Sequence, residues 1–157
     1  MKRLLISTLA LIGLSGAAQA CPNWSLNPTY GAYNISLAQL RQGQNLSLTA
    51  GGSIDWNNCP QIRVGSDDGP GFFEQAPDVR FFVNNVEGRR LTISVRSNCD
   101  STLLINTQSQ SWYYDDDDNG NADAKIVLTR PVSGQIDVWV GTYDGEYCDA
   151  NVAIQAS

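Results

Sequence analysis

The sequence predicts an all-β fold, an antiparallel β-sandwich or jelly roll of about 8–10 short strands. After the first twenty positions, no apolar helical period extends beyond a few residues. Short runs of alternating apolar and polar residues are instead separated by turn sequences such as Asp68-Gly69-Pro70-Gly71 and Asn119-Gly120. Alternation with a period of two is typical of half-buried strands, and Gly, Pro, Asn and Asp favour the turns between them.

Two of these runs show the alternation most clearly. In residues 91–96 the leucine, isoleucine and valine would face a core, and the polar residues between them would face water. In residues 135–141, Trp139 lies opposite three aliphatic side chains, so its ring either packs in a second cluster or meets solvent. A helical pattern is confined to residues 37–40. The other expected strands are residues 33–37, 45–49, 61–64, 79–83, 102–105, 111–114, 125–128 and 151–154.

Residues 1–20 have the pattern of a cleaved secretory signal peptide. Lysine and arginine stand at positions 2 and 3, residues 4–14 form a short apolar run, and Ala18-Gln19-Ala20 supplies small residues before the cut. The apolar run is too short to span a bilayer, and no later segment reaches the roughly 18–20 apolar residues that a span needs. We therefore expect residues 21–157 to form a single β-sandwich domain without a transmembrane segment, either periplasmic or secreted.

A lipoprotein is the rival interpretation of this N-terminus. Cys21 would be the first residue after the cut, as in acylated bacterial lipoproteins. Such signals usually carry leucine three positions before the cysteine, where this chain has Ala18. A cleaved, unacylated N-terminus is therefore preferred.

The charge of residues 21–157 excludes one class of partner. Eight basic residues stand against sixteen acidic ones in this range, a net charge of −8. A nucleic-acid-binding face needs clustered lysine and arginine, and only Arg89-Arg90 forms such a pair. We expect no nucleic acid among the partners, and instead a protein or glycan ligand in the bacterial envelope.

The cysteines predict two disulfides. Cys21, Cys59, Cys99 and Cys148 are even in number and lie in an exported chain, where disulfides form and persist. Three pairings are open in principle. Pairing Cys21 with Cys59 and Cys99 with Cys148 is preferred, because it closes one loop in each half of the chain without entangling them. Each bridge would stabilise the fold by roughly 2–4 kcal/mol.

The absence of histidine from the sequence excludes most familiar enzyme mechanisms. Ser-His-Asp and Cys-His catalysis both need an imidazole, and so do His-ligated zinc sites. A carboxylate-dependent carbohydrase needs only two acidic residues, but no pattern distinguishes Glu74, Glu87 or Glu146 as its proton donor. The sequence therefore favours a non-enzymatic binding or accessory module, and the carbohydrase stays an alternative.

An acidic segment after residue 114 has the spacing of a calcium loop. Asp115, Asp117 and Asn119 alternate ahead of Gly120, and Asp123 follows at the ninth position. Calcium prefers six to eight oxygen ligands, which alternate residues in a tight turn can supply. The twelfth position holds no glutamate, so the loop is not an EF-hand. We predict calcium as a stabilising ligand there; the alternative is a solvated acidic hairpin tip that discourages edge-to-edge aggregation.

Aromatic residues are concentrated in the last third of the chain. Trp139 and Tyr143 are predicted binding residues, because exposed aromatic rings stack on sugars and anchor protein partners. The alternative for Trp139 is a place in the core, whereas Tyr143 stands in the turn sequence 141–145 and would be exposed.

Two motifs carry a resemblance to a known group of proteins. They are Trp112-Tyr113-Tyr114 with the four aspartates after it, and the sequence from Pro131 to Tyr143. With Gly51-Gly52-Ser53, Ala76-Pro77-Asp78 and residues 101–105, they make the chain resemble small periplasmic proteins related to bacterial pre-peptidase C-terminal domains. The resemblance covers most of residues 21–157 and implies a β-sandwich or jelly roll with an acidic turn between two strands. It also implies an accessory role in secretion, localisation or substrate binding; a serine-peptidase label is not supported without histidine.

A second similarity is to periplasmic inhibitors of invertebrate-type lysozyme, whose inhibitory loop carries Ser-Gly-x-Tyr. Ser133 and Gly134 match its first two positions, and Ile136 stands where that motif has tyrosine. Inhibition of a lysozyme-like enzyme is therefore a further alternative function, with Ser133, Gly134 and Tyr143 as its predicted binding residues.

Overall fold

The computed structural model describes residues 20–157. The predicted signal peptide lies outside the described residues, apart from Ala20. Within them, no helix has the length and apolar character needed to cross a membrane. The described chain is built of eleven strands, one short α-helix and one 3₁₀ turn. In chain order these are β1 (Ala32–Ile35), α1 (Leu37–Gln42), β2 (Gln44–Ala50), β3 (Ile54–Asp55), η1 (Trp56–Asn58), β4 (Phe72–Phe73), β5 (Val79–Val83), β6 (Leu91–Ser97), β7 (Ser101–Thr107), β8 (Trp112–Asp115), β9 (Lys125–Leu128), β10 (Gly134–Thr142) and β11 (Cys148–Ala156).

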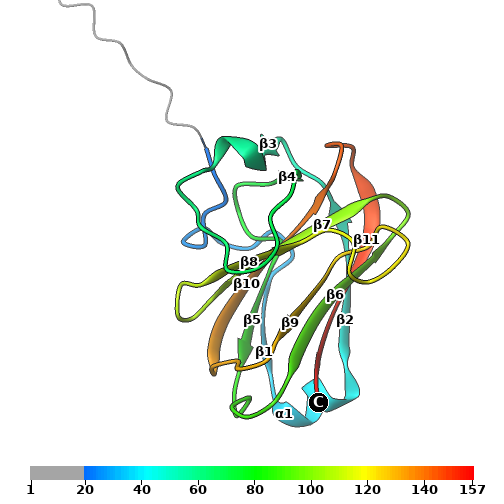
Figure 1. Cartoon of the computed structure of the whole chain (residues 1–157). Coiled ribbons are helices and arrows are strands. Elements are labelled where there is room, and N and C mark those ends of the chain that lie inside the picture. Colours follow the sequence, from blue (N-terminus) through cyan, green and yellow to red (C-terminus); the bar gives the residue numbers. More distant parts are fainter. Residues whose placement is uncertain (1–19) are drawn as a thin grey trace, which may run out of the picture.

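The strands form two sheets that pack face to face, as predicted for a β-sandwich (Figure 1). The larger sheet has seven strands in the order β1-β5-β10-β4-β3, with β7 paired to β10 and β8 paired to β7. The smaller sheet has four strands in the order β2-β11-β6-β9. β1 and β5 run parallel, and the other paired strands of the described chain are antiparallel.

The main core lies between the two sheets and follows the alternation in the sequence. In β6 the buried positions are Leu91, Ile93 and Val95, as predicted, because successive side chains of a strand point to opposite faces. In β10, Ile136 and Val138 enter the same core from the larger sheet.

A second apolar cluster covers the outer face of the larger sheet. It combines Trp56 of η1 with Tyr114 of β8, Leu104 of β7 and Trp139 of β10. The rings of Trp56 and Tyr114 are stacked, with their centroids 6.4 Å apart. Because this cluster covers the outer face, β7 and β10 are buried on both faces over most of their length.

The structure corrects two sequence predictions. Residues 61–64 do not form a strand, because the chain there is a turn that makes only an isolated bridge from Val64 to Trp112. The helical pattern at residues 37–40 extends to a six-residue helix, α1. A capping box starts it: the Ser36 Oγ accepts the backbone N–H of Gln39, and the Gln39 Oε1 accepts the backbone N–H of Ser36.

Both disulfides have the pairing that the sequence analysis preferred. Cys21 is bonded to Cys59, which ties the start of the described chain to the end of η1. Cys99 is bonded to Cys148, which ties the turn between β6 and β7 to the first residue of β11. Such bridges persist in oxidising compartments outside the cytoplasm.

Candidate binding groove

The turn between β10 and β11 presents two tyrosines to solvent. The side chains of Tyr143 and Tyr147 are 48% and 59% exposed. The turn that carries them is held at both ends: the backbone N–H of Tyr143 donates to the carbonyl of Asp100, and Cys148 is bonded to Cys99. Two large rings are therefore exposed on a braced segment, which reduces the entropy lost when a partner binds them.

Tyr147 is positioned by a glycine and a glutamate. Gly51, with φ +120°, leaves room for the turn, because a Cβ there would lie 3.0 Å from Cδ1 of Tyr147 and 3.1 Å from the carbonyl oxygen of Glu146. The Tyr147 hydroxyl donates to Oε1 of Glu74 over 2.6 Å. This hydrogen bond raises the pKa of Tyr147, because it stabilises the protonated phenol beside a negative charge.

A groove of about 460 Å³ lies beside this turn. Its walls are the N-terminal segment (residues 26–30), the end of β2, the loop between β4 and β5, and Tyr147. Its volume is in the range of small-ligand sites, roughly 300–1,000 Å³. The lining residues are Leu26, Thr29, Tyr30, Thr49, Gly51, Glu74, Gln75, Ala76, Asp78 and Tyr147.

Asp78 is the buried acid of the groove, with 3% of its surface exposed. Its Oδ2 accepts the backbone N–H of Val140 over 2.7 Å, at the point where the ladder between β5 and β10 has ended at Val138. Burial raises the pKa of Asp78 to about 7, against the hydrogen bond from Val140, and the charge of Glu74 adds to the rise. A carboxyl with this pKa in a groove marks a candidate functional site.

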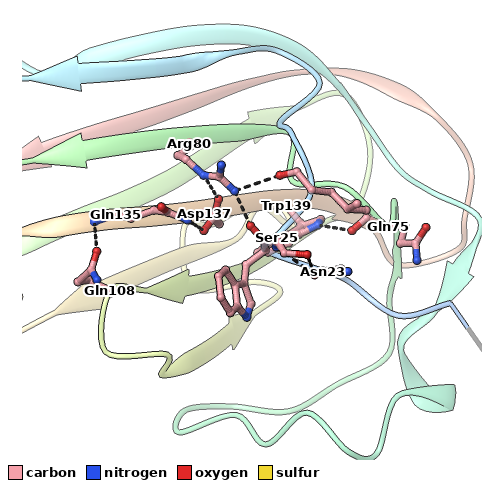
Figure 2. A network of polar contacts seen from close by, with 10 residues as sticks. Asn23, Ser25, Gln75, Arg80, Gln108, Gln135, Asp137 and Trp139 are labelled. Atoms are coloured by element: carbon pink, nitrogen blue, oxygen red, sulfur yellow. Dashed lines mark hydrogen bonds and ion pairs between the residues drawn. The ribbon is translucent and has the colours of Figure 1, made fainter.

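The N-terminal segment that forms one wall is held by Arg80. The Arg80 guanidinium donates to the carbonyls of Trp24 and Leu26, and its Nε lies 2.6 Å from Oδ1 of Asp137 (Figure 2). Gln135 donates to the other oxygen of Asp137. Arg80 therefore connects the larger sheet to the N-terminal segment.

Negative charge surrounds the exposed turn. Asp144 lies within the turn, and Asp100, Asp117 and Asp123 come from the neighbouring turn and loop. The pKa of Asp100 is raised, first by partial burial and then by the charges of Asp144, Asp117 and Asp123. This end of the sandwich is the acidic end, defined by residues 98–100, 116–124 and 143–147.

Trp139 does not lie at a surface site, which corrects its prediction as a binding residue. Its side chain is fully buried in the second apolar cluster, with its ring centroid 5.2 Å from that of Trp112. Its Nε1 donates to the carbonyl of Gln75 over 3.4 Å. A surface ligand therefore does not reach the ring, and the core alternative holds.

The other predicted binding residues do not form one site. Gly134 and Thr142 are the two ends of β10, so Ser133 and Tyr143 flank the strand from opposite ends. At roughly 3.3 Å per residue, the eight steps from one end of the nine-residue strand to the other span about 26 Å. The backbone N–H of Ser133 donates to Glu87 in the turn between β5 and β6. Tyr143 alone among these three predicted residues lies at the acidic end.

The predicted calcium ligands are engaged in hydrogen bonds. The Oδ2 of Asp115 accepts the backbone N–H groups of Asp118 and Lys125. The Oδ1 of Asp123 accepts the backbone N–H and the hydroxyl of Ser97, together with the hydroxyl of Ser101. The side-chain amide of Asn119 donates to the carbonyl of Val95, and Asp117 is exposed. Among residues 20–157, no group of three or more acidic or cysteine side chains is arranged to hold a metal ion.

Calcium binding therefore stays a prediction of the sequence, and thermal melting tests it. If the ion binds, calcium at about 1 mM, the range of extracellular calcium modules, will raise the melting temperature and chelator will reverse the rise. Asp117→Asn, which removes the exposed predicted carboxylate, should reduce that rise. Identical melting curves in calcium and in chelator would mean that hydrogen bonds alone hold the loop.

Sequence reasoning missed Glu74 and Asp78 as a pair. In the sequence, Ala76-Pro77-Asp78 contributes only to the resemblance, and no pattern distinguishes Glu74 from the other acidic residues. The sequence offers one signal for Asp78, which is its place directly before the alternating strand at residues 79–83. There its side chain accepts the backbone N–H of Val140 and so continues the pairing of β5 with β10. Its burial depends on the N-terminal segment, which packs from about fifty residues away in sequence.

Comparisons with known proteins found similar solved structures but no similar sequence. No known family model matches the sequence, and no curated protein is significantly similar to it in sequence. Among solved structures, the chain is similar to the pre-peptidase C-terminal domain of collagenase from Bacillus anthracis, with 14% identity, a TM-score of 0.45, and coverage of 84% of this chain and 100% of that one.

Two periplasmic inhibitors of g-type lysozyme, both called PliG, are also similar in structure. The protein from Aeromonas hydrophila has 11% identity and a TM-score of 0.43, and the protein from Salmonella Typhimurium has 12% identity and a TM-score of 0.40. Each match covers 80% of this chain and 97% of the inhibitor. No site residue is assigned from these matches. The chain is thus similar, over most of its length, to a pre-peptidase C-terminal domain, the kind of protein that its sequence motifs resemble.

Proposed function

We propose that the chain is a non-enzymatic binding module of the bacterial envelope that holds a basic protein partner at its acidic end. The observation that carries the proposal is the pair of exposed tyrosines, Tyr143 and Tyr147, on a turn braced by the Cys99–Cys148 disulfide. Exposed, preorganised aromatic side chains are common anchors of protein interfaces.

The charge around the tyrosines specifies the kind of partner. Asp100 and Asp144 flank the turn. The pKa of Asp100 is raised first by partial burial and then by the neighbouring carboxylates, Asp144 first among them, which repel one another. A surface that carries lysine and arginine would relieve this repulsion on binding and would be steered to it over a distance. A basic protein therefore fits the acidic end better than an acidic protein or an anionic polymer.

Capture from envelope extract tests the proposal. We expect the immobilised, oxidised protein to retain a basic protein, and we expect Tyr143→Ala and Tyr147→Ala each to reduce retention at least about tenfold, as for interface hot spots. High salt should weaken binding, because it screens the charges at the rim of the interface.

Tyr33→Ala is the matched control for these variants. Tyr33 is also an exposed tyrosine, 41% accessible, but it lies on β1, away from the acidic end. Its replacement should leave retention unchanged. Equal loss in all three variants, or a retained protein that is acidic, would overturn the proposal.

The lysozyme-inhibitor alternative is a special case of this function, and purified g-type lysozyme tests it. An inhibitor would lower the rate of cell-wall lysis, and Tyr143→Ala would restore that rate. Ser133→Ala should have no effect of its own if the acidic end is the inhibitory surface, because Ser133 lies at the other end of β10.

For the carbohydrase alternative, the two carboxyls that line the groove, Glu74 and Asp78, are the candidate catalytic pair. A carboxyl with a raised pKa close to a second carboxyl is the pattern that glycoside hydrolysis uses. Release of reducing sugar from envelope polysaccharides, abolished by Glu74→Gln, would replace the binding proposal with a hydrolytic one.

A further inference from the structure

The groove has two carboxyls and no counter-charge. Glu74 and Asp78 both line it, and no lysine or arginine of residues 20–157 does so. The ion pair found in this part of the chain joins Arg80 to Asp137, outside the groove. Carboxyls held together without a cation favour a positively charged group from outside the chain.

One carboxyl oxygen of Asp78 accepts no hydrogen bond from the described residues. The carboxyl of Asp78 is almost fully buried, and its Oδ2 accepts the backbone N–H of Val140. No hydrogen bond from residues 20–157 reaches its Oδ1. This oxygen is not among the fully buried, unpartnered atoms of the described chain, so it keeps access to the groove that Asp78 lines. It can therefore accept a hydrogen bond from a donor on a ligand in the groove.

An aromatic ring stands beside the second carboxylate. The Tyr147 hydroxyl donates a hydrogen bond to Oε1 of Glu74. The other oxygen, Oε2, accepts no hydrogen bond within the described chain. Tyr30, also in the lining, is fixed by accepting the backbone N–H of Thr49 through its hydroxyl. A cation between a carboxylate and a tyrosine ring gains both Coulomb and cation–π attraction.

We infer that this groove binds a cationic side chain, an arginine or a lysine, presented by the partner protein. The N–H donors of the side chain fill the acceptors of Glu74 and Asp78, and the ring of Tyr147 covers one face of the cation. This inference rests on the proposed function, since it names the part of a basic partner that enters the groove. A neutral sugar would leave the two carboxyls without a counter-charge.

Nuclear magnetic resonance with small probes tests the inference directly. The oxidised, isotope-labelled protein is titrated with arginine amide and, separately, with lysine amide, each acetylated only on its α-amino group so that the side chain keeps its charge. The neutral isostere N-acetylcitrulline amide is the control for shape. We expect one or both cations, but not citrulline, to shift the backbone resonances of residues 74–78 and of Tyr147.

A matched pair of variants separates the groove from general negative charge. Glu74→Gln should weaken binding of the cationic probe at least about fivefold, the size of a charged hydrogen bond. Glu87→Gln makes the same change at an exposed position between β5 and β6, outside both the groove and the acidic end, and should leave affinity unchanged. Unaltered spectra of each free variant away from its own position would show that both remain folded.

The pH dependence of probe binding gives a second readout. The titratable groups that line the groove around Asp78 are Glu74 from the same loop, Tyr147 from the turn and Tyr30 from the N-terminal segment. Because the pKa of Asp78 is raised to about 7, its carboxyl gains charge between pH 6 and 8, so affinity should rise over this range. One proton allows at most about a tenfold rise, and Asp78→Asn should remove it.

The outcomes of these experiments distinguish the cation site from the proposed function on which it rests. If a basic protein is captured through Tyr143 but the cationic probes shift no groove resonance, the inference is wrong and the proposed function stands. If the probes bind in the groove but no basic protein is captured, the cation site stands and the proposed function fails. Equal binding of citrulline, or equal weakening by Glu87→Gln, would overturn the cation site.

Discussion

Replacing Arg80 with alanine is expected to lower the free energy of unfolding by about 3–5 kcal/mol, the usual cost of leaving a buried charge unpaired. Arg80 pairs with Asp137, which is 1% exposed, through an Nε–Oδ1 contact of 2.6 Å. Burial already raises the pKa of Asp137 against the hydrogen bonds from Gln135 and Arg80. Without the guanidinium, the carboxylate must either stay charged in the core or take up a proton.

The same substitution removes donors from the N-terminal segment, because the carbonyls of Trp24 and Leu26 both accept from Arg80. Chemical denaturation at neutral pH measures the loss. The double variant Arg80→Ala with Asp137→Asn is the control and should lose less stability than Arg80→Ala alone, because it leaves no buried charge. A loss below about 1 kcal/mol in the single variant would mean that the pair behaves like an exposed one.

Replacing Asp78 with asparagine is expected to stabilise the protein at pH 8. The pKa of Asp78 is raised from 3.8 to about 7 in the folded protein, chiefly by burial. As pH rises from about 4 to 7, the unfolded chain loses this proton while the folded protein keeps it, so stability falls. At 1.36 kcal/mol per pKa unit, the loss above pH 7 is at most about 4 kcal/mol.

Asparagine cannot ionise, and its side-chain oxygen can still accept the N–H of Val140, so it escapes this loss. The gain over the wild type should be small near pH 4 and largest near pH 8, which denaturation across that range measures. Asp118→Asn, at an exposed position, should show no such dependence. A constant difference between Asp78→Asn and the wild type at all pH values would contradict a raised pKa at Asp78.

The alternation of apolar and polar residues predicted several strands correctly, because the apolar positions are the ones that pack in the core. The alternation at residues 91–96 matches β6, and residues 125–128 are the bounds of β9. Prediction failed where tertiary contacts decide the structure. Val64 pairs with Trp112 by an isolated bridge, and β3 and β4 have two residues each, too few to show a period.

The candidate site was harder to predict than the fold, because its parts come from distant segments. Tyr143 was predicted to be exposed from its turn sequence alone, and it is. For Trp139 the sequence left a surface binding role and a place in a second cluster both open, because alternation does not show what covers the outer face of a sheet. The cover from η1 and β8 creates that second cluster. The groove at Asp78 needs the N-terminal segment, and no local pattern indicates where that segment packs.

The bridge between Cys21 and Cys59 anchors the segment whose residues 26–30 form one wall of the groove. A chain kept in a reducing environment would lose this anchor. The wall would then be held by Arg80, by backbone contacts and by Tyr30, which packs on the main core and hydrogen-bonds to Thr49. Assembly of the proposed ligand site would therefore be tied to thiol oxidation, and the wall would be complete only in an oxidising environment.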